Sequence, residues 1–325
     1  MGYKLIQQVA AAVVAALALN AGAQAQSYPA KPIRMFVSYP AGGANDIVAR
    51  AVGQKVTELL GQSVVVENRS GAGGTIGADA AAKSAPDGYT LLMAAGAHTL
   101  APSLYVKLPY DIVKDFSPVS LSAKSAYLLV LHPSVPAKSV KELIALARTR
   151  PGSLTYASSG VGAPPHLAAE MFSAMAGVKM THVPYKGDTP AIQDLLGGHV
   201  DLGFIAVSAT SILVKAGKLK ALAVTSAQRT PVMPDLPTVA AASGFPDYEI
   251  TTWWGMLAPA GTPPEAINRL AGAMAKIAQL PDIRERFGGL GLEATSNTPE
   301  QFSAFIKSEI AKFGKLAKLA NVKPE

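Results

Sequence analysis

The sequence contains no cysteine. This absence excludes disulfide bonds, cysteine-ligated zinc or iron–sulfur centres and a cysteine nucleophile. Charged residues are also scarce, at 16 % of the 325 residues, whereas 49 % are hydrophobic. That apolar fraction excludes a disordered chain, and 29 glycines with 24 prolines are too few for a collagen-like or low-complexity protein. Because the chain is longer than one hydrophobic core of ordinary size supports, we expect two domains.

The positive net charge does not indicate a nucleic-acid partner. Lysine and arginine number 29 against 22 acidic residues, which gives a formal charge of +7. No arginine-rich arm occurs, and the densest basic stretch is a set of lysines between Lys307 and Lys323, spaced along a predicted helix. We therefore predict a solvated helix face and no nucleic acid among the partners.

The first 25 residues have the features of a bacterial export signal. Lys4 is followed by an uninterrupted apolar run over residues 9–19 and then by Ala23-Gln24-Ala25, a small-residue cleavage pattern. The run is too short to span a bilayer, which takes about 20 apolar residues. We therefore predict a signal peptide over residues 1–25, cleaved after Ala25, and a mature protein in the periplasm.

Beyond residue 26, short β-rich runs alternate with runs of helical period. The predicted strands cover residues 33–37, 64–66, 89–94, 127–131, 154–157, 181–184, 200–205, 219–225 and 250–257. Apolar residues between them recur at helical spacing, and the C-terminal tail is helical. This alternation is typical of a mainly parallel sheet with helices on both faces. The order of strand, glycine-rich turn and helix occurs in residues 33–50 and again in 154–175, which predicts two similar α/β lobes.

The motifs of the common enzyme classes are missing. The sequence has no G-x-S-x-G nucleophile elbow and no phosphate-binding G-x-x-x-x-G-K-[ST]. His166 and Glu170 stand four residues apart, and His199 precedes Asp201 by two, but neither pair has a third ligand for a metal. We therefore predict no catalytic residues, no metal and no cofactor.

Glycine-rich loops before helices instead favour anion binding. Such loops include residues 42–43, 73–75, 158–162 and 187, each between a predicted strand and a predicted helix. Free backbone N–H groups and the helix dipole make a helix N-terminus attractive to a carboxylate or phosphate. In open α/β sheets, ligands bind beyond the carboxyl ends of the strands, where these loops lie. We therefore predict a ligand cleft.

Four segments carry a family resemblance. They are residues 39–50 (YPAGGANDIVAR), 66–78 (VENRSGAGGTIGA), 183–187 (VPYKG) and 254–263 (WGMLAPAGTP). These segments, with others that match between them in the same order, resemble the Bug, or tripartite tricarboxylate transporter, solute-binding proteins. The resemblance covers essentially the whole chain after residue 26.

This resemblance implies a fold of the Venus flytrap type, with two α/β lobes that are each a mainly parallel sheet flanked by helices. Two crossing segments would separate a first lobe, residues 26–124 and 248–325, from a second lobe, residues 125–247. It also implies a monomer without catalytic activity. Such a protein captures a small carboxylate or related organic solute between its lobes and delivers it to the subunits of a membrane permease.

The resemblance also implies ligand contacts in both lobes. Those expected in the first lobe are Tyr39, Ala41, Gly42, Gly43, Asp46, Gly74 and Thr75. Those expected in the second lobe are Ser158, Ser159, Gly160, His166, Tyr185 and Gly187, with Asp188 beside the cleft. Glycine at Gly43 and Gly160 would allow close approach of the ligand to the backbone and could supply positive φ.

Three residues depart from the family pattern. Ala163 replaces a hydroxyl residue, Ile205 replaces an aspartate, and Asp188 replaces a small neutral residue. Asp188 has two interpretations. Either its charge disfavours highly charged acids in the cleft, or it caps the helix that is predicted to begin near Thr189.

Two other functions remain open from the sequence. A ligand-sensing protein that signals to a membrane kinase would use the same fold, and a hydrolase or isomerase could use His166 and Asp46. The two tryptophans, Trp253 and Trp254, are adjacent in the second predicted crossing segment. Adjacent residues of a strand point to opposite faces, so we expect one indole in the first-lobe core and the other at the cleft.

Overall fold

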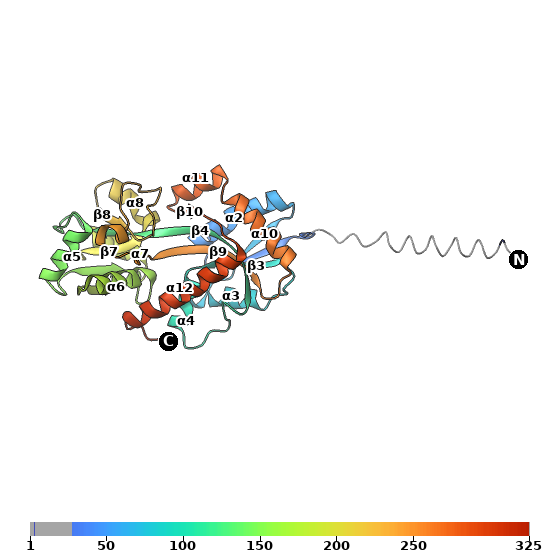
Figure 1. Cartoon of the computed structure of the whole chain (residues 1–325), viewed down its shortest axis with the longest axis horizontal. Helices are drawn as coiled ribbons and strands as arrows, with labels where there is room; N and C mark the ends of the chain where they lie inside the picture. Colours follow the sequence, from blue (N-terminus) through green and yellow to red (C-terminus); the bar gives the residue numbers. More distant parts are fainter. Residues whose placement is uncertain (1–2, 4–27, 325) are drawn as a thin grey trace.

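The structure is a computed structural model that describes residue 3 and residues 28–324. The predicted signal peptide lies outside the described residues, except for residue 3. Figure 1 shows two α/β lobes, with the first lobe on the right and the second lobe on the left. Within the described part of the chain, no helix has the length and hydropathy needed to cross a membrane.

The first lobe contains a mixed sheet. Strands β1 (Ile33–Val37), β2 (Val64–Asn68) and β3 (Thr90–Ala95) are parallel, with β1 in the middle. Strand β9 (Thr251–Pro259) pairs antiparallel with β3. The predicted strands at these positions are confirmed to within three residues at each end. The short strand β10 (Glu293–Ala294), which the sequence did not predict, joins this sheet through β4 (Phe116–Leu131).

The second lobe repeats the parallel arrangement. Strand β5 (Thr155–Ser158) pairs in parallel with β6 (Thr181–Pro184) on one side and with β7 (Leu202–Ala206) on the other. Strand β8 (Lys220–Val224) pairs with β4. All four strands were predicted from the sequence, β6 with the same ends and the other three with ends that differ by one or two residues.

A single long strand joins the two lobes. Strand β4 (Phe116–Leu131) pairs antiparallel with β9 from Phe116 to Ala126, and from Tyr127 onward it pairs with β7 and β8. The sequence predicted only residues 127–131 of it, because residues 116–126 are rich in serine and lack the continuous apolar run of the second half. β4 and β9 together form the connection between the lobes.

Helices cover both faces of each sheet, and the apolar side chains beneath them form the cores. In the first lobe, α2 (Ala44–Leu60), α10 (Pro264–Ile277) and α11 (Pro281–Gly289) cover one face. On the other face, α3 (Thr75–Ala82) follows the 3₁₀ turn η1 (Ala72–Gly74), and its apolar side chains share a core with those of α12 (Pro299–Leu319). Helix α4 (Ala97–Leu104), which the sequence did not predict, follows β3 and contacts α12.

In the second lobe, α5 (Val140–Thr149), α6 (Pro164–Ala176) and α9 (Val239–Ser243) cover one face. The other face is covered by α7 (Asp188–Leu196) and by α8 (Val207–Lys215), which the sequence also did not predict. The two-lobed α/β fold is therefore confirmed.

The C-terminal helix contacts both lobes. Helix α12 (Pro299–Leu319) places Phe302 and Ile306 in the first-lobe core, whereas Phe313 and Leu316 lie in the core of the second lobe. Figure 1 shows α12 running diagonally from the first lobe toward α4 and α6. The lobe boundaries predicted from the sequence place all of residues 248–325 in the first lobe. They therefore do not anticipate that α12 also contacts the second lobe.

A close approach within the first lobe provides a test of the packing. Gly255 on β9 lies against the ring of Phe302, and a Cβ atom at Gly255 would overlap that ring. We expect Gly255→Ala to lower the free energy of unfolding by about 1–3 kcal/mol, as overpacking of a core does. In the matched control Gly272→Ala, the new methyl group enters open space on α10 and costs no stability. Chemical denaturation measures both variants, and an unchanged stability of Gly255→Ala would contradict this packing.

Candidate ligand-binding cleft

A cleft lies between the lobes on one face of the crossing strands. It consists of two adjoining cavities of about 380 and about 410 Å³, which share Ala44, Pro164, Thr252 and Trp254 as lining residues. The first cavity extends toward the second lobe and the other toward the loop that precedes α2. Because both lobes contribute to the walls, a molecule bound here would contact both at once.

Four helices begin at this cleft. In none of the four does a side chain cap the N-terminus with a hydrogen bond. Their N-cap residues are Gly43 for α2, Ala163 for α6, Gly187 for α7 and Ala206 for α8. The first N–H groups of a helix have no partner within it, so uncapped ends offer donors to a ligand. Helix α6 offers fewer, because Pro164 and Pro165 at its start carry no N–H.

Asp46 fixes the loop that precedes α2. Its carboxylate accepts hydrogen bonds from the backbone N–H of Gly42 (2.9 Å), from the side-chain amide of Asn68 (2.9 Å) and from Nε of Arg50 (3.0 Å). Burial alone would raise the pKa of this carboxyl group, but these hydrogen bonds lower it below its ordinary value. Asp46 is therefore an ionised residue that shapes the loop, and it does not line either cavity.

Tyr39 forms part of the cavity wall beside this loop. Its hydroxyl donates to the backbone carbonyl of Gly73 (3.3 Å), and burial raises its pKa to about 12. Its ring lies against His98, a buried residue that the sequence analysis did not single out. His98 accepts a hydrogen bond at Nδ1 from the backbone N–H of Ala95 (3.0 Å), and burial lowers its pKa to about 4. Neutral His98 thus holds the turn between β3 and α4.

Polar side chains also fix the glycine-rich loop of the second lobe. Ser158 lies 2.6 Å from Nε2 of His182 and accepts a hydrogen bond from the backbone N–H of Gly160 (3.2 Å). His166 accepts at Nδ1 from the backbone N–H of Gly162 (3.0 Å), and its ring stacks on His182 with centroids 4.0 Å apart. Burial lowers the pKa of both imidazoles, that of His182 to about 4. Ser158, His166 and His182 therefore hold the glycine-rich loop in place.

The loop before α7 brings one acidic side chain to the cleft. Tyr185 donates its hydroxyl to Asp194 (2.6 Å) within its own lobe, and burial followed by this contact raises its pKa to about 12. The backbone N–H of Gly187 donates to the carbonyl of Ser159 (3.2 Å). Asp188 is the first residue of α7 and lines the cavity of about 380 Å³ beside Ser159. The interpretation of Asp188 as the helix cap is wrong, because Gly187 occupies that position and no side chain caps the helix.

Of the residues predicted to contact a ligand, four line the cleft. These are Tyr39, Gly43, Ser159 and Asp188. The others lie in the same loops or behind them without lining either cavity: Ala41, Gly42, Asp46, Gly74, Thr75, Ser158, Gly160, His166, Tyr185 and Gly187. Gly74 is packed beneath the hydroxyl of Tyr39, which leaves no room for a side chain. The predicted residues therefore belong to the loops around these cavities, but most of them do not line either one.

Sequence reasoning missed much of the apolar wall. Ile47, Pro164, Trp254, Leu290 and Leu292 line the cavity between the lobes. Only Trp254 had a sequence signal, its position next to Trp253 on a predicted strand. The hydroxyl residues Ser125, Tyr127, Ser208 and Thr252 add polar atoms to the same wall.

The other two departures from the family pattern have different consequences. Ala163 is the N-cap of α6 and supplies no capping side chain, as expected from the loss of a hydroxyl group. Ile205 does not affect the cleft, because it is 2 % exposed and packs in the second-lobe core, while the next residue, Ala206, lines the cavity.

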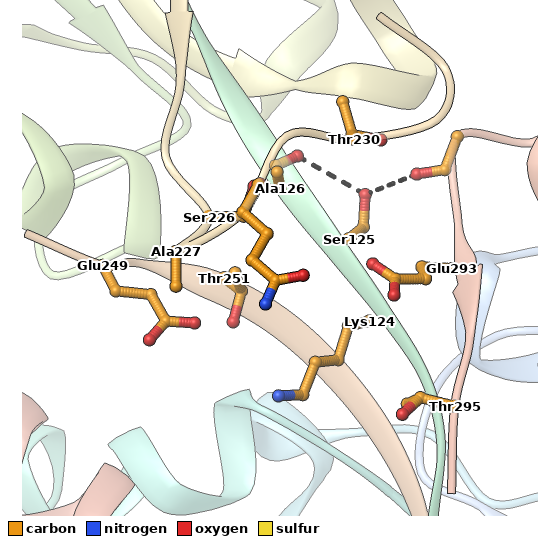
Figure 2. A pocket seen from close by; sticks show the side chains of 12 residues that line it. Lys124, Ser125, Ala126, Ser226, Ala227, Thr230, Glu249, Thr251, Glu293 and Thr295 are labelled. Atoms are coloured by element: carbon orange, nitrogen blue, oxygen red, sulfur yellow. Dashed lines mark hydrogen bonds between the residues drawn. The ribbon is translucent and has the colours of Figure 1, made fainter. Parts of the chain in front are cut away.

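A third cavity lies against the other face of the crossing strands (Figure 2). It has a volume of about 220 Å³, and its walls come from β4, β10 and the segment after β8. Figure 2 shows Lys124, Glu249 and Glu293 around it, together with Ser125, whose hydroxyl donates to the backbone carbonyl of Gly291 (2.9 Å). Two carboxylates against one ammonium group make this cavity unfavourable for an anion. The cleft with its helix N-termini is the better candidate for the ligand site.

Comparison with known proteins identifies the family of this chain. Residues 48–322 match the family model described as the tripartite tricarboxylate transporter family receptor, and this chain belongs to that family. It is 38 % identical over 302 residues to BugT of Bordetella pertussis, which covers 92 % of each chain.

Solved structures show the same relationship. Rpa4515 of R. palustris, solved with adipate, is 36 % identical with a TM-score of 0.75, over 92 % of this chain and 100 % of the other. MatC of Rhodopseudomonas palustris, with bound malate, is 31 % identical with a TM-score of 0.70, over 89 % and 99 %.

The two tryptophans should report on the cleft separately. Trp253 is fully buried between Phe302 and Phe305, with centroids 5.6 Å from each, whereas Trp254 lines both cavities of the cleft. We expect the solute that co-purifies with the protein to change the emission of Trp254 and to leave that of Trp253 nearly unchanged.

Titration of Trp253→Phe and Trp254→Phe with this solute separates the two signals. If the Trp254→Phe variant, which retains Trp253, carried the whole response, the placement of the cleft would be wrong.

Gly43 provides a second test. Its φ of −76° is an ordinary value, so the expectation of positive φ there was wrong, and a Cβ atom would approach only the carbonyl oxygen of Pro40, at 3.5 Å. We expect Gly43→Val to change the free energy of unfolding by less than about 1 kcal/mol. It should nevertheless abolish binding, because the branched side chain fills the approach to the N-terminus of α2.

Gly272→Val is the control, since Gly272 lies on α10 away from the cleft. Calorimetry measures the ligand affinity, and chemical denaturation measures the free energy of unfolding. If Gly43→Val binds the ligand with full affinity, this loop is not part of the site. Gly160→Val is a poorer probe, because φ is +140° at Gly160 and any side chain is strained there.

Proposed function

We propose that this protein binds a small carboxylate in the periplasm, between its two lobes, and delivers it to a membrane permease. The observation that carries this proposal is the cleft itself, where uncapped helix N-termini from both lobes face one cavity. The export signal predicted in residues 1–25 supports a periplasmic location.

Helix N-termini can hold the carboxylate without a cationic side chain. Among the described residues that line the two cavities of the cleft there is no lysine, arginine or histidine. Each helix end contributes about 0.3–1 kcal/mol toward an anion, and up to about 2 kcal/mol where it is partly buried. Ala44 at the start of α2 and Ser208 at the start of α8 line the same cavity, so two such ends can act on one ligand.

The relatives support a carboxylate as the ligand class. Adipate and malate are the ligands named for two structures with the same fold and more than 30 % identity. Both ligands are small acids with an aliphatic body, which suits a cleft of this size and apolar wall.

The positions of the ionisable side chains favour binding over catalysis. The hydrolase or isomerase hypothesis requires His166 and Asp46 as acid and base, but His166 accepts from Gly162 and Asp46 accepts from three donors of its own lobe. Neither side chain lines the cleft. A general acid or base has to reach the substrate, so binding is the function that this arrangement supports.

Native mass spectrometry of the protein purified from the periplasm tests the proposal. We expect a mass increment that disappears on unfolding, and mass spectrometry of the released compound should identify a small carboxylic acid that incubation with the protein leaves unchanged. A released compound without a carboxyl group, or its chemical conversion, would contradict the proposal.

Affinity for that acid should change less than about threefold between about 0.05 and about 0.5 M salt, because partly buried dipoles are screened less than exposed charges. Loss of uptake in a strain that lacks the protein tests the delivery to a permease.

A further inference from the structure

Asp188 is the one acidic side chain among the described residues that line the cleft. It belongs to α7, faces the same cavity as Ala44 of α2 and Ser208 of α8, and lies beside Ser159. Ser159 and Tyr127 line the same cavity, and the pKa of the Tyr127 hydroxyl is raised by burial and then by the charge of Asp188.

This carboxylate has no cationic partner among the residues that the structure describes. No described lysine, arginine or histidine lines the cleft, and none of the ion pairs among the described residues includes Asp188. Lys186, two residues earlier, is exposed and does not line the cavity. Burial raises the pKa of Asp188, which shows that its environment disfavours an unpaired negative charge.

Asp188 also divides the cleft electrostatically. A carboxylate in the first turn of a helix interacts favourably with that helix's own dipole, so Asp188 uses the positive potential of α7. The uncapped ends of α2 and α8 remain available to a ligand anion, whereas the end at α7 repels one. One side of the cavity thus favours a negative group and the other favours a positive group.

We propose that the ligand is an amino-carboxylate, whose carboxylate binds at the N-terminus of α2 and whose ammonium group pairs with Asp188. This inference rests on the proposed carboxylate-binding function and names the substrate class within it. An ammonium group donates to Asp188 and compensates its charge, whereas a second carboxylate at the same place would repel it. The body of the ligand packs on Trp254, Pro164 and Leu292.

Two series of compounds that differ only at one end test this inference. The linear series is 6-aminohexanoate, adipate and hexanoate, and the aromatic series is 4-(aminomethyl)benzoate, terephthalate and 4-methylbenzoate. Each has an ammonium, a carboxylate or a methyl group opposite the same carboxylate. In the series that fits the cleft, calorimetry should show the amino acid binding about tenfold tighter than the methyl compound, with the dicarboxylate weakest.

The variant Asp188→Asn separates the charge from the shape of the side chain. It should reduce the preference for the amino acid over the dicarboxylate to within about threefold, mainly because the dicarboxylate gains affinity. Asp247→Asn makes the same charge change on an exposed loop residue outside the cleft and should keep the parent preference. Thermal unfolding of both variants confirms that they are folded.

The outcomes distinguish this inference from the function on which it rests. If the dicarboxylate or methyl compound binds as tightly as the amino acid, or Asp188→Asn keeps the parent preference, the inference is wrong and carboxylate binding stands. Co-purification of an acid that has no amino group would likewise contradict the inference and leave carboxylate binding intact. If no compound of either series binds and the co-purified solute has no carboxyl group, the proposed function fails as well.

Discussion

The continuity of β4 is the constraint on which the rest of the structure depends. One strand of 16 residues pairs with β9 in the first lobe and with β7 and β8 in the second, so the two sheets are tied to a common backbone. The two faces of this connection carry different cavities, since Thr252 lines the cleft and its neighbour Thr251 lines the cavity behind it. The alternation of side chains along β9 thus turns Thr252 and Thr251 toward different cavities, whereas Ser125 of β4 lines both the cleft and the polar cavity of Figure 2.

In the cleft, side chains and backbone groups have different roles. Asp46, Ser158 and His166 make hydrogen bonds inside their own loops, which fixes the start of α2 and of α6. With those side chains engaged, the groups left to face the ligand are backbone N–H donors, hydroxyl groups, an apolar wall and Asp188. Such a cleft recognises an anion by fixed dipoles, which need little rearrangement on binding. Among the described residues, Asp188 is the one charged group that lines the cleft, and it is therefore the natural place for selectivity among acids.

Much of the fold could be predicted from the sequence, because nine strands contain local β-rich runs. What could not be predicted depends on tertiary pairing. The first half of β4 has small polar residues that form a strand only because β9 pairs with it, and α8 follows β7 without a turn that would mark its start. The site shows the same division: motifs identified the loops, but whether Asp46 or Asp188 lines the cavity depends on contacts distant in sequence, such as the hydrogen bond from Asn68 to Asp46.

A crystal structure of the protein with its co-purified solute tests the central claim most directly, namely that the ligand lies between the lobes with its carboxylate at the N-terminus of α2. We expect electron density between Trp254 and Asp188, with carboxylate oxygens within hydrogen-bond distance of the first N–H groups of α2. Density in the cavity lined by Lys124 and Glu293, or a carboxylate held by an arginine or lysine side chain, would contradict it.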